Sequence, residues 1–166
     1  MYDSYGSGIR LFIWLEAMAS LHTVFRTTLE ADATLTALLT GGIFDAEELD
    51  YSGEGAGQAP RQADAVQLKP HAVIRWSGGS PAGASYKVAG EVESVEVYVY
   101  QDVGYDVIES AILRMRTVLG DRYLSADDRA LAHVSKQPFR GPQTTADELG
   151  MASCQFVRFF VTTAPL

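Results

Sequence analysis

Residues able to bind a metal or attack a substrate are present in this sequence, but they are scattered. The three histidines, His22, His71 and His133, lie far apart, and none has a second ligand at the spacing that a metal site needs. The single cysteine, Cys154, excludes a disulfide within the chain and fits a reducing compartment. Bulky apolar residues surround it, and a thiol in such surroundings is usually unreactive. We therefore predict neither a metal site nor a cysteine nucleophile.

Three further patterns resemble catalytic motifs without completing them. The glycine-rich segment 53–57 resembles a nucleotide-binding loop. Its third glycine is not at the spacing that such a loop needs, no Lys-Ser/Thr pair ends it, and no strand precedes it. Ser80 lies among glycines, but the second glycine comes one residue too late for a nucleophile elbow. Glu91, Glu93 and Glu96 could pair as acid and base, yet a solvated sheet face explains them better. The sequence indicates a protein that is not an enzyme and needs no cofactor.

The composition is that of a folded domain with an acidic surface. A chain of 166 residues is expected to form a single domain, residues 1–166, that buries roughly two-thirds of its unfolded surface. The formal charge of −8 argues against general affinity for nucleic acid, because binding a phosphate backbone needs clustered Lys and Arg. No apolar run reaches membrane-spanning length. Residues 11–15 resemble the core of a signal peptide, but Glu16 interrupts them, so we expect a helix there instead.

The strongest strand signal lies in residues 91–100. From residue 95 onwards, valines alternate with Glu and Tyr, which is the period of a strand with one face on a core. Val92 is out of phase with the later valines, and this predicts a bulge near Ser94.

A helix is predicted to follow this strand directly, over residues 106–119. Asp106 and Glu109 have the spacing of a capping box, and Gly120 ends the helix. The apolar stripe that the helix would bury comprises Ile108, Ala111, Ile112, Met115, Val118 and Leu119.

A second long helix is predicted over residues 9–30, after a flexible lead-in at residues 1–8. Ile9, Phe12 and Ile13 fall outside its apolar stripe, so the first turns are apolar nearly all round. They either lie under the N-terminal tail or meet a neighbouring subunit. The stripe itself comprises Leu11, Trp14, Leu15, Met18, Leu21, Phe25 and Leu29.

A long irregular stretch over residues 45–69 carries a cluster of acids. Loops of this length are uncommon in compact domains, and they are generally functional or disordered. The stretch is either a solvated loop without a role or a segment that orders against a partner. Its acids are Asp45, Glu47, Glu48, Asp50 and Glu54.

The remaining elements are shorter. Asp32 is expected to cap a short helix that ends at Gly41. Strands are predicted at residues 70–76, weakly at 131–136, and strongly at 151–163. Both faces of the last strand are largely apolar, so it is either central in its sheet or covered by a partner.

Together these elements predict an α+β domain. Two main helices, residues 9–30 and 106–119, pack on one face of a mainly antiparallel sheet of about four strands, with one long acidic loop.

The order of elements resembles the tail terminator (tail completion) proteins of long-tailed bacteriophages. The match is one of pattern over most of the chain, without a catalytic motif. This chain differs in the 45–69 insertion and in the longer segment before Leu29. The segments that carry the resemblance are 29–44 with its glycine-to-Ile-Phe exit, the proline-led 70–74, the strand and helix of 95–120, and the closing 156–163.

The resemblance implies a structural ring, commonly hexameric, that caps the tail tube and joins it to the head connector in the neck. The expected partners are further copies of the chain, the tail tube protein and the head–tail connector or stopper protein, with DNA only in transit and no membrane. The protein would be made in the host cytoplasm and reside in the virion. Residues proposed for the ring interface or lumen are Asp45, Glu47, Glu48, Asp50, Glu54, Ile9, Phe12 and Ile13.

Two alternatives remain open at this point. A head–tail connector or stopper would also be a small ring-forming protein with long loops. A monomeric ligand-binding or enzymatic α+β domain would instead enclose a pocket between its sheet and helices. The mass in solution separates this last class from the ring proteins.

Overall fold

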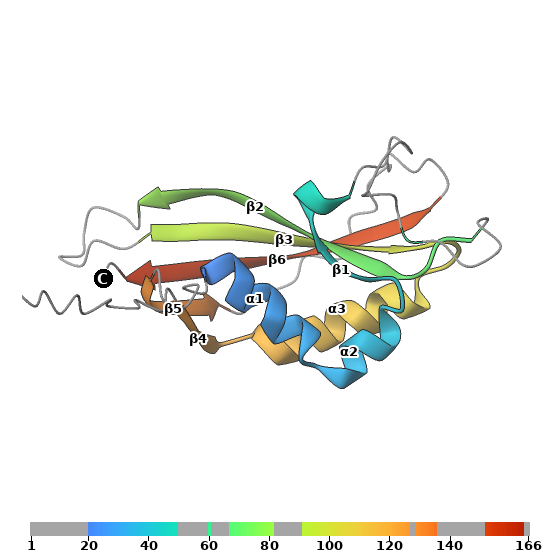
Figure 1. Cartoon of the computed structure of the whole chain (residues 1–166), viewed down its shortest axis with the longest axis horizontal. Coiled ribbons are helices and arrows are strands. Elements are labelled where there is room, and N and C mark those ends of the chain that lie inside the picture. The colour runs from blue at the N-terminus through green and yellow to red at the C-terminus, as the bar shows by residue number, and fades with distance from the viewer. Residues whose placement is uncertain are drawn as a thin grey trace, which may run out of the picture.

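The computed structural model of the protein describes residues 20–49, 60, 67–81, 91–126, 129–135 and 152–164. The fold is α+β, as the sequence predicts (Figure 1). In chain order the elements are α1 (Leu21–Glu30), α2 (Ala33–Leu38), β1 (Gly42–Asp45), the 3-10 turn η1 (Ala46–Glu48), β2 (His71–Pro81), β3 (Glu91–Gln101), α3 (Asp106–Leu119), β4 (Arg122–Ala126), β5 (Arg129–Ser135) and β6 (Ser153–Ala164).

The strands form one sheet of six, in the order β1-β2-β3-β6-β5-β4. Neighbouring strands are antiparallel except β1 and β2, which are parallel. The prediction of about four strands was wrong, because it missed β1 and β4. These are the two edge strands, and with 4 and 5 residues they are too short to show a clear alternation. Strand β6 lies between β3 and β5, so the prediction of a central strand is confirmed.

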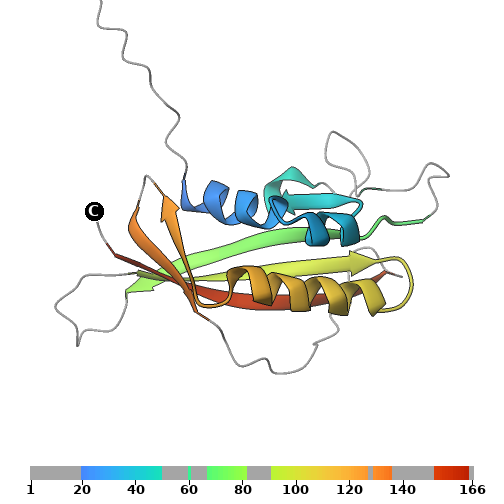
Figure 2. The same cartoon turned by 90° about the horizontal axis from the view of Figure 1, so that it is seen from below.

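All three helices lie on one face of the sheet (Figures 1 and 2). Helices α1 and α3 each contact the strands, while α2 packs against both of them. No helix in the described ranges is long and apolar enough to span a membrane. The core between the layers includes Phe25, Leu29, Leu35, Ile74, Val97, Ile108, Met115, Leu119 and Phe159.

The opposite face of the sheet is covered at one end only, among the residues that the structure describes. There a smaller cluster forms where η1 and the residues next to it fold over the sheet (Figure 1). Its buried members are Leu49, Leu68, Val73, Tyr100 and Cys154.

The first helix begins later than predicted. Ser20 has extended backbone angles, φ −65° and ψ 159°, and its hydroxyl accepts a hydrogen bond from the backbone N–H of Thr23 at 3.3 Å. Ser20 is therefore the N-cap, and the helix cannot run without a break from residue 9 to Glu30. The predicted interface residues Ile9, Phe12 and Ile13 lie outside the described residues.

The predicted bulge is in the neighbouring strand. Strand β3 keeps an unbroken register with β6 over its whole length. The shift in the β2–β3 pairing instead falls between Ser77 and Ser80, so the extra residue is in β2, which continues to Pro81. Val92 is out of phase because Glu93, only 9% exposed, occupies the core-facing position next to it. Glu93 therefore does not lie on a solvated sheet face.

The start of α3 also differs from the predicted capping box. Tyr105 is the N-cap and makes no side-chain cap hydrogen bond. The cap is provided by Gln101, whose amide donates to Asp106 Oδ1 at 2.7 Å and whose carbonyl oxygen accepts from the N–H of Val107 at 3.2 Å. The hydrogen bond from Gln101 lowers the pKa of Asp106. Glu109 is exposed on the first turn.

Candidate functional site

The described part of the acidic stretch is held by one arginine. Arg26 Nη1 lies 2.7 Å from Glu48 Oε2 and 3.2 Å from Asp45 Oδ2. Its Nε also donates to Glu30 on the next turn of α1, at 2.8 Å. The hydrogen bond from Arg26 lowers the pKa of Glu48, and the bonds to these acids raise the pKa of Arg26.

The predicted acidic residues therefore do not form one uniform set. Asp45 and Glu48 fix η1 to α1, and Glu48 Oε2 also accepts the backbone N–H of Asp45 at 3.1 Å. Glu47 is exposed. Asp50 and Glu54 lie outside the described residues. Two of the five acids, Asp45 and Glu48, therefore stabilise the fold. Spacing in the sequence could not predict this, because their partner Arg26 is about twenty positions before them.

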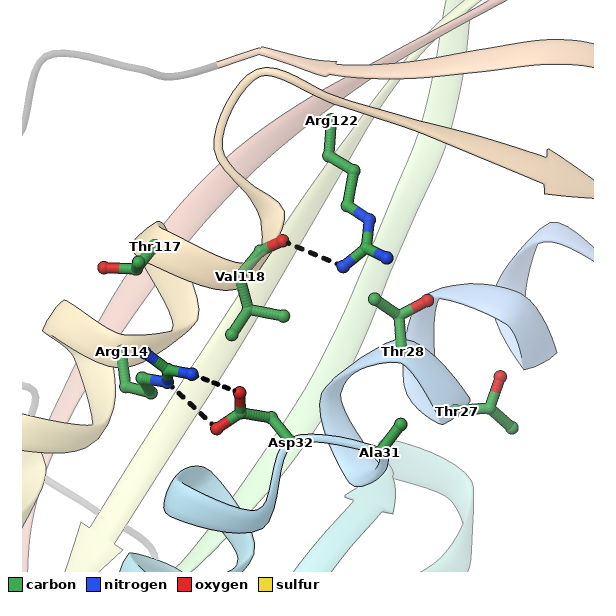
Figure 3. A pocket seen from close by; sticks show the side chains of 8 residues that line it. All are labelled: Thr27, Thr28, Ala31, Asp32, Arg114, Thr117, Val118 and Arg122. Atoms are coloured by element: carbon green, nitrogen blue, oxygen red, sulfur yellow. Dashed lines mark hydrogen bonds and ion pairs between the residues drawn. The ribbon is translucent and has the colours of Figure 1, made fainter.

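A groove of about 660 Å³ runs between the C-terminal end of α1 and the last turns of α3 (Figure 3). Asp32 lies in it between the two helices, and its carboxylate binds the Arg114 guanidinium in a bidentate pair. The residues that line the groove are Thr27, Thr28, Ala31, Asp32, Arg114, Thr117, Val118 and Arg122.

The polar groups of this groove are committed to the fold. The hydroxyls of Thr27, Thr28 and Thr117 each donate to a backbone carbonyl one turn earlier in their own helix. Arg122 donates to the Val118 carbonyl at 3.4 Å. Because each hydroxyl donates to a helix carbonyl and the carboxylate is bonded to Arg114, these groups are not arranged as a nucleophile paired with a base.

A second surface lies on the sheet face opposite the helices, beyond the small cluster. Arg75, Glu96 and Arg158 are register partners in a row across β2, β3 and β6. Arg158 Nε donates to Glu96 Oε1 at 2.8 Å, and the Tyr98 hydroxyl donates to Glu96 Oε2 at 2.8 Å. Although burial opposes it, these two hydrogen bonds lower the pKa of Glu96.

Aromatic rings complete this surface. Tyr98 and Phe156 stack with their centroids 5.2 Å apart. The Arg75 guanidinium lies 4.6 Å from the centre of the Tyr98 ring, and that of Arg158 lies 5.8 Å from the Phe156 ring. We call Arg75, Glu96, Tyr98, Phe156 and Arg158 the arginine–aromatic face. Sequence patterns do not pair these residues, because only the register of β2, β3 and β6 brings them together.

The three histidines have different neighbours, and His133 lies beside Tyr123. His22 stacks on Trp76 at 3.9 Å, with its Nε2 3.8 Å from Glu93 Oε2. His71 is buried against Tyr100 on the other side of the sheet. Within the described ranges, no three His, Cys, Asp or Glu side chains are grouped so that they could hold a metal ion.

Comparison with known proteins gives a match at the level of fold. No protein-family model matches the chain, and no curated protein sequence matches it. Among solved structures, the fold is similar to that of a chain in the virion of a native gene transfer agent particle, with a TM-score of 0.57 and 18% identity. The alignment covers 87% of this chain and 95% of that chain. The two chains therefore share a fold along nearly their whole lengths.

Proposed function

We propose that this chain is a structural protein of a phage-like virion. The observation that carries the proposal is the likeness in fold to a chain of a gene transfer agent virion, over 87% of this chain. A match that extends over 95% of the other chain indicates that the whole domain, and not a common substructure, is shared.

The surfaces of the molecule support a role in assembly. The groove between α1 and α3 has its carboxylate tied to Arg114 and its hydroxyls tied to helix carbonyls. The arginine–aromatic face presents rings and guanidinium groups, which are enriched where proteins bind one another. On the arginine–aromatic face, the Tyr98 hydroxyl is bonded to Glu96, which is itself paired with Arg158. The protein acts by binding other subunits and not as an enzyme.

Within the virion, we propose that copies of the chain form a ring, most simply a hexamer, in the tail or neck. The ring caps the tail tube and joins it to the head connector, and DNA passes through it during delivery. This finer assignment comes from the sequence pattern shared with tail terminator proteins. The formal charge of −8 fits such a role, because an acidic bore does not retain passing DNA.

The mass of the full chain in solution tests the ring. A monomer has a mass of 18.0 kDa, so native mass spectrometry separates it clearly from a closed ring. We expect a single closed species at micromolar concentration or after addition of the tail tube protein, seen as rings by negative-stain microscopy. A chain that stays monomeric under both conditions would contradict the proposal and favour a ligand-binding domain.

The position along the tail axis needs a second measurement. Tagged protein should co-purify with the tail tube protein from assembled particles, and labelling should mark the head-proximal end of the tail. Co-purification with the portal-side connector alone would instead assign the chain to the neck as a stopper.

A further inference from the structure

The turn that joins β3 to α3, residues 102–105, presents an apolar side chain at its tip. Val103 is 79% exposed, more than any other large hydrophobic side chain that the structure describes. The turn nevertheless has a fixed shape, because Gln101 Nε2 donates to the Val103 carbonyl at 2.9 Å and to Asp106 Oδ1 at 2.7 Å. Gly104 adopts a φ of +88°, which other residues disfavour. Such a preorganised turn loses little conformational entropy when it binds a partner.

The α1–α3 groove has a surface that can receive this turn. Its lining includes Ala31, Val118 and the methyl groups of three threonines. Leu113, 65% exposed, lies one turn before Thr117 on the same side of α3 and extends the apolar surface at the rim. With a volume of about 660 Å³, the groove is large enough for the tip of a turn.

The groove carries a positive charge that is not paired within the described residues. Its one carboxylate, Asp32, is neutralised by the bidentate bond to Arg114. Arg122 has only a long hydrogen bond, 3.4 Å, to the Val118 carbonyl. The lining therefore has a net charge of +1, and most of the five N–H donors of Arg122 remain available to a partner.

The turn carries the opposite charge. Asp102 and Asp106 stand on either side of the Val103 tip in the sequence, and Glu109 is exposed on the first turn of α3. The helix dipole by itself favours acids at this end of α3 and arginines at the other. It does not account for a valine held at the tip of a rigid turn. Apolar shape and charge together make the turn and the groove complementary.

We propose that the β3–α3 turn of one copy inserts Val103 into the α1–α3 groove of the next copy, with Asp102 beside Arg122. The inference rests on the proposed ring and names its subunit contact. The turn precedes α3 and the groove lies beside its last turns, so the two surfaces are at opposite ends of the helix (Figures 2 and 3).

This separation decides how the copies are joined. Helix α3 has 14 residues and is about 20 Å long, so the turn cannot reach the groove of its own chain. A contact between two different surfaces is head-to-tail, and it closes into a ring when the rotation between copies allows.

Two substitutions in the full chain test the two sides of the contact. Val103→Arg places a bulky cation at the tip of the turn, and Thr117→Arg fills the groove and adds a third arginine to it. We expect each to raise the concentration at which rings dissociate by at least about tenfold, measured by native mass spectrometry. Both positions are exposed, so thermal melts of the variants should stay within about 2 °C of the unmodified chain.

Matched controls place the same charge elsewhere. Tyr123→Arg replaces another exposed apolar side chain, 62% exposed, on β4. Thr36→Arg replaces an exposed threonine of α2 whose hydroxyl, like that of Thr117, donates to a carbonyl one turn earlier. Rings of both controls should dissociate at the same concentration as those of the unmodified chain. Equal weakening by the controls would overturn the inference.

Mixing the two variants shows whether the turn and the groove belong to one contact. The Val103→Arg chain keeps an intact groove, and the Thr117→Arg chain keeps an intact turn. One contact can therefore form between them, and it cannot be continued. We expect a 1:1 dimer of two 18.0 kDa chains, at tenfold higher concentration because an open dimer lacks the closure of a ring. A mixture that contains only monomers would overturn the inference.

The outcomes separate this inference from the proposed function. Rings that persist in both variants would overturn the inference and leave the proposed function standing. Rings lost in one variant only would also overturn it, because a single contact needs both surfaces. An unmodified chain that never forms rings, even with the tail tube protein, would remove the proposed function itself.

Discussion

Asp32 and Arg114, 82 positions apart in the sequence, form a bidentate ion pair that ties the α1–α2 junction to α3. The Arg114 guanidinium donates to Asp32 Oδ1 at 3.0 Å and to Oδ2 at 2.6 Å. Asp32 is also the N-cap of α2, because Oδ1 accepts the backbone N–H of Leu35 at 2.8 Å. One carboxylate thus starts a helix and fixes its position.

This pair predicts a pH dependence of stability. The hydrogen bonds from Arg114 and then from the Leu35 N–H lower the pKa of Asp32 from 3.8 to about 2. The stabilisation is therefore complete above pH 4 and is lost as the pH falls toward 2. Asp32→Asn keeps the cap but removes the charge, so we expect its melting temperature to be lower than that of the unmodified chain at pH 7. The difference should shrink as the pH falls below 4 and should vanish only below pH 2.

Asp32→Ala and Glu109→Gln complete this experiment. The Ala variant loses both cap and ion pair, and its melting temperature should fall below that of the Asn variant by a few degrees, on the order of 3 °C. Glu109→Gln removes an exposed carboxylate from α3 and should change little. Equal melting temperatures for the Asn variant and the unmodified chain at pH 7 would show that the ion pair does not stabilise the fold.

His71 predicts a second pH dependence. Its ring is fully buried and stacks on Tyr100, with Nδ1 2.9 Å from the Lys69 carbonyl oxygen. Burial outweighs that hydrogen bond and lowers the pKa of His71 from 6.5 to about 4. The neutral ring donates from Nδ1, and the unfolded chain binds a proton at a higher pH than the folded one. Stability should therefore fall as the pH drops from 6.5 to 4, by up to about 3 kcal/mol from this group.

Denaturant titrations between pH 7 and pH 4 measure this effect, and His71→Phe provides the comparison. A Phe ring preserves the stacking on Tyr100 but cannot titrate, so the slope over this pH range should flatten. His22, which lies at the surface beside Glu93, gives a matched control as His22→Phe. If NMR shows that the His71 ring titrates near pH 6.5 in the folded protein, the assignment of a buried neutral ring is wrong.

The sequence predicted the elements whose signal is local. Strand β3, helix α3 and the Asp32 cap of α2 are where alternation, an apolar stripe and a capping residue placed them. Strands β1 and β4 were missed because each is short and is defined by pairing with a neighbour.

Contacts between distant positions were beyond the reach of sequence patterns. Nothing in the sequence pairs Arg26 with Asp45 or Arg114 with Asp32, since ion pairs of this kind depend on how helices pack. The break in alternation at Val92 also arises from a contact between distant positions. It reflects a core-facing Glu93 beside His22, a contact across 71 positions that is visible only in the folded chain.

The buried stripe of α3 predicts a sharp contrast between neighbouring positions. Met115 is 0% exposed, while Leu113, two residues earlier on the same helix, is 65% exposed. Met115→Asp places a charge in the core without a partner, and we expect loss of cooperative unfolding at neutral pH. Leu113→Asp should melt within about 2 °C of the unmodified chain. Circular dichroism melts of the two variants decide the matter, and an unchanged melt for Met115→Asp would refute the packing of α3.

Cys154 should react slowly with thiol reagents in the native protein. It is 1% exposed and packs in the small cluster with Leu49, Leu68 and Tyr100. A reagent can reach it only if the residues around η1 move away from the sheet. We expect labelling over hours in buffer and within minutes in guanidinium chloride, followed by absorbance. Complete labelling of the native chain within minutes would show that the cluster does not cover the thiol.

The last prediction concerns Arg26, which connects the acidic stretch to α1. Its guanidinium contacts Glu30 in the same helix and also Asp45 and Glu48, so Arg26→Gln removes both bonds that join the η1 region to α1. Because these groups are partly exposed, the cost to global stability should be small, within about 1 kcal/mol. The local effect should be larger: hydrogen exchange of residues 45–49 should accelerate by about tenfold or more, while that of β3 stays unchanged.

Arg122→Gln, which removes an arginine with one weak bond to the Val118 carbonyl, is the control and should leave residues 45–49 unaffected. If exchange in residues 45–49 is the same with and without Arg26, the stretch is held by other contacts. In that case the bonds from Arg26 to Asp45 and Glu48 do not hold η1 against α1.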